Sequence, residues 1–168
     1  MSLFRQLWLA VIVSTLIAFV GSFAVSMMTA RQYLEEQLAI KNNDNAASLA
    51  LSMSQMDKDP VTLELQVAAL FDSGQYARIQ VRDPEGLTLI EKTSPAVSDD
   101  VPAWFARLFP IASRPGSAQI STGWTQFGTV ELVSHNRFAY RELWQGGWRL
   151  LMWFSLGGVL AGFLGMQI

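Results

Sequence analysis

The chain has 168 residues, with 12 Lys and Arg against 14 Asp and Glu, and one histidine. This mild acidity provides no basic surface for nucleic acid, so we expect no nucleic-acid partner. Cysteine is absent, which excludes disulfides and thiolate chemistry. The charges are unevenly distributed, because all but one of the Asp, Glu, Lys and Arg residues lie within residues 31–149.

An uncharged apolar segment lies near each end of the chain, at residues 7–29 and 150–168. Each is long enough to cross the hydrocarbon core of a bilayer, roughly 30 Å, as a helix. A cleaved signal peptide is the alternative for the first segment, with Ala24-Val25-Ser26 as the cleavage site. The length of the segment and its unbroken continuation into a helix favour an uncleaved anchor.

These segments predict three regions. Residues 1–30 form a cytoplasmic start and transmembrane helix 1, residues 31–148 an output domain outside the cytoplasm, and residues 149–168 transmembrane helix 2. The few flanking Lys and Arg residues place the N-terminus inside. Because apolar sequence continues to the last residue, we expect a fragment of a longer receptor whose cytoplasmic part is missing.

The first half of the output domain reads as two helices and a hairpin. A helix over residues 29–56 continues the first span, and a second over residues 61–71 has Asp59 as N-cap and Pro60 at its first position. Strands are predicted at residues 76–82 and 87–93, joined by the turn Asp83-Pro84-Glu85-Gly86.

The second half of the output domain is predicted to contain a short helix, a second hairpin and a final helix. A short helix over residues 101–109 is expected to be capped by Asp100, with Trp104 packing it on the sheet. Two strands, 117–124 and 127–134, would meet around Thr125-Gln126, and a helix from residue 137 merges with the second span. The predicted fold is α+β: a PAS-like domain with an antiparallel sheet, flanked by two transmembrane helices.

The residue types needed for catalysis or metal binding do not assemble. His135 has no second histidine or cysteine to act with, no Asp/Glu cluster has ligand spacing, and no glycine-rich phosphate loop is present. We therefore expect no catalytic residues, no metal ligands and no cofactor-binding residues in this segment. A hydrolase acting through His135 is the weakest reading.

The second apolar segment carries a pairing signal. Gly158 and Gly162 form a GxxxG pair, and Ala161 with Gly165 adds a second small pair. Small residues let transmembrane backbones approach closely and so favour helix pairing. The alternative is that glycine is simply common in such helices.

Trp124 is the aromatic residue whose place is hardest to explain by packing. It lies in Gly123-Trp124-Thr125-Gln126 at the expected hairpin tip, where an exposed Trp would be a ready anchor for a protein partner. Strict alternation places it on the same face as Ile120, which would make it part of the core. The pattern alone leaves both readings open.

Several stretches in the same order along nearly the whole chain resemble the N-terminal region of LapD-type inside-out signalling receptors, which are inner-membrane cyclic di-GMP effectors of Gram-negative bacteria. The stretches are Met1-Ser2-Leu3-Phe4-Arg5-Gln6-Leu7, Phe71-Asp72-Ser73-Gly74-Gln75-Tyr76, Val101-Pro102-Ala103-Trp104-Phe105, Gly123-Trp124-Thr125-Gln126 and Val130-Glu131-Leu132-Val133-Ser134-His135.

The resemblance implies a periplasmic output domain that forms a homodimer with exchanged elements. In that family a HAMP relay and degenerate GGDEF and EAL domains follow, and the EAL domain binds cyclic di-GMP in the cytoplasm. The dimer then captures a periplasmic calcium-dependent cysteine protease, which prevents adhesin cleavage and promotes biofilm retention. The Trp of the Gly-Trp hairpin enters a pocket on the protease. This role maps to Trp124, with Gly123, Thr125 and Gln126 beside it.

The alternative is a PAS-like periplasmic small-ligand sensor domain of a histidine kinase or diguanylate cyclase type receptor. Such a sensor needs a polar-lined pocket between the sheet and the helices. Arg78 and Arg82 are the residues that the sequence offers for it.

Overall fold

A computed structural model describes residues 3–56, 59–95 and 101–166. It divides into two compact units. The first combines Met1–Gln32 with Arg141–Ile168, and the second is Tyr33–Tyr140.

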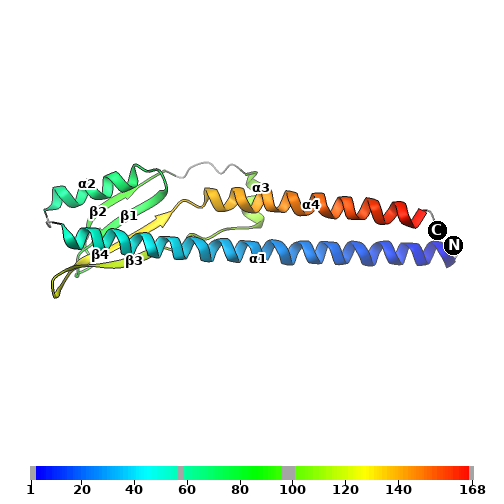
Figure 1. The fold of residues 1–168 in the computed structure, drawn as a ribbon, viewed down its shortest axis with the longest axis horizontal. Coiled ribbons are helices and arrows are strands. Elements are labelled where there is room, and N and C mark those ends of the chain that lie inside the picture. The colour runs from blue at the N-terminus through cyan, green and yellow to red at the C-terminus, as the bar shows by residue number, and fades with distance from the viewer. Residues whose placement is uncertain (1–2, 57–58, 96–100, 167–168) are drawn as a thin grey trace. The chain divides into compact units, whose positions relative to one another are not determined.

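The second unit contains one four-stranded sheet in the order β2-β1-β4-β3 (Figure 1). Its strands are β1 (Tyr76–Arg82), β2 (Thr88–Thr93), β3 (Gly116–Thr122) and β4 (Thr125–Ser134). Every neighbouring pair is antiparallel. The predicted α+β class with an antiparallel sheet is therefore confirmed.

The helices are α1 (Leu3–Gln55), α2 (Pro60–Phe71), α3 (Ala103–Leu108) and α4 (Arg137–Met166). The expected start of α2 is confirmed, because the Asp59 carboxylate accepts a hydrogen bond from the Thr62 backbone N–H at 3.3 Å. The predicted cap of α3 is wrong. Its N-cap is Pro102, which makes no side-chain cap hydrogen bond, and Asp100 lies outside the described residues.

The core lies on one face of the sheet. Strand residues alternate in direction, so Ile79 and Val81 of β1 point to the same side as Val130 and Leu132 of β4. Both α1 and α2 pack on this face, through Ala46, Leu49, Ala50, Met53, Leu63 and Val67. Tyr76 is also buried here, and burial raises the pKa of its hydroxyl because the phenolate is poorly solvated.

The first unit contains the apolar part of α1 and most of α4. Phe19 and Phe154 stack with ring centroids 5.3 Å apart. Met27 is buried, and Gly147 lies beside it, with room for a Cβ at van der Waals distance, 3.4 Å, from its side chain. Within the described parts of the chain, one helix is long and apolar enough to cross a membrane, at Gln6–Gln55. The second predicted span stays a prediction.

Candidate functional site: the hairpin of β3 and β4

A two-residue turn joins β3 to β4. Thr122 pairs with Thr125, so Gly123 and Trp124 are the central residues. Gly123 has φ +61°, whereas no described residue other than glycine has a positive φ. Glycine with positive φ at the first central position fits a type II′ turn, whose twist matches that of the strands.

The predicted turn at Thr125-Gln126 is therefore wrong by two residues, because these two residues begin β4. The physical reason is the cost of a positive φ, which glycine alone adopts readily. The chain reverses where Gly123 stands, and Trp124 is displaced from the strand to the tip.

Trp124 is fully exposed, at 105% of its reference area. Gly123, Thr125 and Gln126 beside it are also exposed, and the Gln126 amide donates to the Thr129 hydroxyl at 3.4 Å. The structure thus decides the question that the alternation pattern left open. Trp104, expected to pack α3 on the sheet, is 59% exposed, and the neighbouring Phe105 is the buried residue instead.

A β-bulge lies close below the tip. Ile120 pairs with Gly128 and Ser121 with Gln126, so Phe127 is the extra residue of β4. Phe127 is partly buried against the core. Any Cβ at Gly128 would clash with the Arg82 carbonyl, so glycine is required where β4 approaches β1.

Polar residues of α1 contact β3, and sequence reasoning missed them. The Asn43 side chain accepts a hydrogen bond from the Ser117 N–H at 3.3 Å, and the Ser54 hydroxyl accepts one from the Ser121 N–H at 3.0 Å. The run Asn42-Asn43-Asp44-Asn45 could have signalled these contacts. Four weak helix formers in succession inside a helix suggest that their side chains have tertiary partners.

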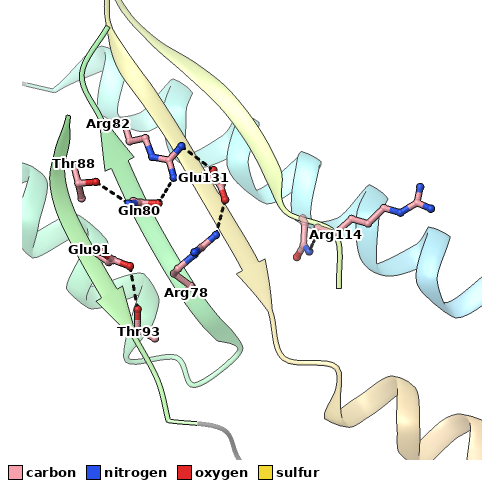
Figure 2. A network of polar contacts seen from close by, with 9 residues as sticks. Arg78, Gln80, Arg82, Thr88, Glu91, Thr93, Arg114 and Glu131 are labelled. Carbon is pink, nitrogen blue, oxygen red and sulfur yellow. Dashed lines mark hydrogen bonds and ion pairs between the residues drawn. The ribbon is translucent and has the colours of Figure 1, made fainter. Parts of the chain in front are cut away.

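Arg78 and Arg82 lie on the other face of the sheet, away from the core. Figure 2 shows both directed toward Glu131, with nitrogen–oxygen distances of 2.7 and 3.6 Å. Arg82 also donates to Gln80 at 2.8 Å, and Gln80 donates to Thr88 at 2.8 Å. Both arginines are thus engaged by neighbours on the open face, rather than lining a space between sheet and helices.

The other candidate residues of the sequence belong to other parts of the chain. Gly158 and Gly162 belong to α4 and are exposed, and nothing within 4 Å would meet a Cβ at either. His135 follows β4, and its backbone N–H donates to the Gln75 carbonyl at 3.0 Å. Among the described residues, no group of three His, Cys, Asp or Glu side chains could hold a metal ion.

The chain thus combines an α+β domain that carries a fully exposed Trp at a two-residue turn with a first helix long and apolar enough to cross a membrane, as a membrane-attached binding domain would. The comparison with protein families makes this class specific. The family model of the LapD/MoxY periplasmic domain matches residues 23–144, and the chain belongs to this family. The matched residues are therefore the periplasmic domain of a LapD-like receptor, as the resemblance implied.

A solved structure of the Pseudomonas fluorescence LapD periplasmic domain is also similar, with 40% sequence identity. The match covers 73% of this chain and 97% of that chain, with a TM-score of 0.41. No curated protein is significantly similar to the chain.

Proposed function

We propose that this region is the periplasmic output domain of a membrane-bound cyclic di-GMP receptor, and that it captures and sequesters a periplasmic calcium-dependent cysteine protease. Sequestration would prevent adhesin cleavage and promote biofilm retention. Membership of the LapD/MoxY periplasmic domain family supports the receptor role. The protease follows from the family resemblance of the chain.

The full exposure of Trp124 is the observation that carries this proposal. A large apolar side chain held in water by a tight turn gains free energy when a partner pocket takes it out of water. Because the turn has only two residues, little conformational entropy is lost on binding. Gly123, Thr125 and Gln126 would form the rim of this contact.

The membrane arrangement is part of the same proposal. Transmembrane helices at 1–30 and 149–168 would place residues 31–148 in the periplasm of a Gram-negative cell as a homodimer in the inner membrane. Cyclic di-GMP would bind to a cytoplasmic part beyond these residues, so no cofactor is assigned to the segment itself.

The test is a direct binding measurement between the chain in nanodiscs and the purified protease with calcium. We expect Trp124→Glu to weaken binding by about 30-fold or more, since central interface Trp residues commonly contribute at least about 2 kcal/mol. The thermal unfolding midpoint should not change, because the side chain is fully exposed.

Trp104→Glu is the matched control, since Trp104 is another exposed Trp of the same unit, on α3 instead of the hairpin. It should retain normal capture. Capture of the protease at unchanged affinity by Trp124→Glu would contradict the assignment of the hairpin.

A further inference from the structure

Two backbone N–H groups of β3, an edge strand of the sheet, donate hydrogen bonds to side chains of α1. An edge strand normally presents unpaired N–H groups to solvent. Here the N–H groups of Ser117 and Ser121 donate to Asn43 and Ser54 of α1, at 3.3 and 3.0 Å. Side chains of α1, which packs on the core face of the sheet, thus bind two N–H groups along this edge.

The two contacts are matched in spacing. From Asn43 to Ser54 the helix rises about 16 Å, and from Ser117 to Ser121 an extended strand advances about 13 Å. The two lengths differ by about 3 Å, which the Asn43 and Ser54 side chains can span, so both hydrogen bonds can form at the same time. A slip of one helix residue would move each side chain by about 1.5 Å and rotate it by about 100°, which would break both.

At the start of β3 the strand and α1 are in direct contact. The Asn42 side chain is fully buried, and a Cβ at Gly116 would clash with the Asn42 backbone. The start of β3 is thus pressed directly against α1. The start of β3 lies against α1 there, and the contact between Ser54 and Ser121 lies further along β3, toward the hairpin tip.

Ser54 is itself held in place. Its hydroxyl donates to the Ala50 carbonyl at 2.7 Å, one helical turn back, which orients the oxygen that accepts from Ser121. Ser121 lies two residues before Gly123. On the opposite side of the hairpin, the bulged Phe127 packs on the core.

We propose that Ser54 is a positioning residue that fixes the base of the β3–β4 hairpin, so that α1 sets where Trp124 is presented. This inference rests on the proposed function of Trp124. Asn43 acts as the second contact along the same strand. Movement of α1 relative to β3 would then change the presentation of Trp124 without any change in the residues that touch the partner.

Amide hydrogen exchange of the full chain in nanodiscs tests the contact without any partner. In Ser54→Ala we expect exchange at Ser121 to accelerate about threefold to tenfold, which is the worth of one ordinary hydrogen bond. Ser54→Thr keeps the hydroxyl and should restore slow exchange. Ser48→Ala, at an exposed serine of the same helix, should change nothing.

Binding of the purified protease then tests the consequence. Ser54→Ala should weaken capture by a similar factor while the chain remains folded, and Ser54→Thr should restore it. Unchanged exchange in Ser54→Ala would overturn the proposal, and so would faster exchange with full capture. If Trp124→Glu also captured normally, the proposed function would fail, while the exchange rates would still decide whether Ser54 holds the hairpin.

Discussion

Asn42 is the most connected buried polar residue of the second unit. Its side-chain oxygen accepts hydrogen bonds from the backbone N–H and the hydroxyl of Ser134, at 3.1 and 2.6 Å. Its amide nitrogen donates to the Arg114 carbonyl at 2.6 Å and the Ser113 hydroxyl at 3.3 Å. One side chain of α1 thereby joins the end of β4 to the loop before β3.

Replacing this residue should be costly. Asn42→Ala leaves the groups of Ser134 and Arg114 without their buried partner, so we expect the free energy of unfolding to fall by about 2–4 kcal/mol. Urea denaturation of the purified chain measures this. Asn43→Ala is the matched control, since Asn43 is exposed and makes one longer bond, and it should cost less than about 1 kcal/mol. Equal losses in the two variants would contradict the role of Asn42.

The β3–β4 hairpin depends on the backbone of Gly123. A Cβ at φ +61° meets the following carbonyl, so Gly123→Ala should lower the free energy of unfolding by about 1–2 kcal/mol. Gly146→Ala in α4 is the opposite case, because nothing lies within 4 Å of its Cβ position and alanine favours helix, and it should stabilise by up to about 1 kcal/mol. Chemical denaturation compares the two. A neutral Gly123→Ala would rule out the strained turn.

Local signals predicted most elements, and tertiary contacts explain the failures. The alternation of β1 and the Asp59-Pro60 start of α2 act within a few residues, so both were predictable. The turn was misplaced because alternation continues through Trp124, whereas the chain reverses at Gly123, which adopts a positive φ. The contacts of Asn42, Asn43 and Ser54 were not predictable, since their partners lie 67 or more residues away.

Across the whole chain, the sequence separated the apolar ends from the polar middle, and one of those ends is confirmed as an apolar helix of spanning length. The exposure of Trp124 required the register of the sheet, which no local pattern contains. Pairing of helices in a membrane is a further property that a single chain cannot display. Such pairing depends on the shape of the helix surface that faces the partner helix.

On α4, that surface contains two glycines. Gly158 and Gly162 lie one turn apart on α4, both exposed, with open space where a Cβ would stand. Helices that pair in lipid approach closely at such small residues. The double variant Gly158→Ile, Gly162→Ile should therefore reduce self-association by on the order of tenfold. Energy transfer between labelled chains in lipid bilayers measures it, with Leu160→Ile as control on the opposite side of the helix. Undiminished transfer in the double variant would show that these glycines do not form the pairing surface.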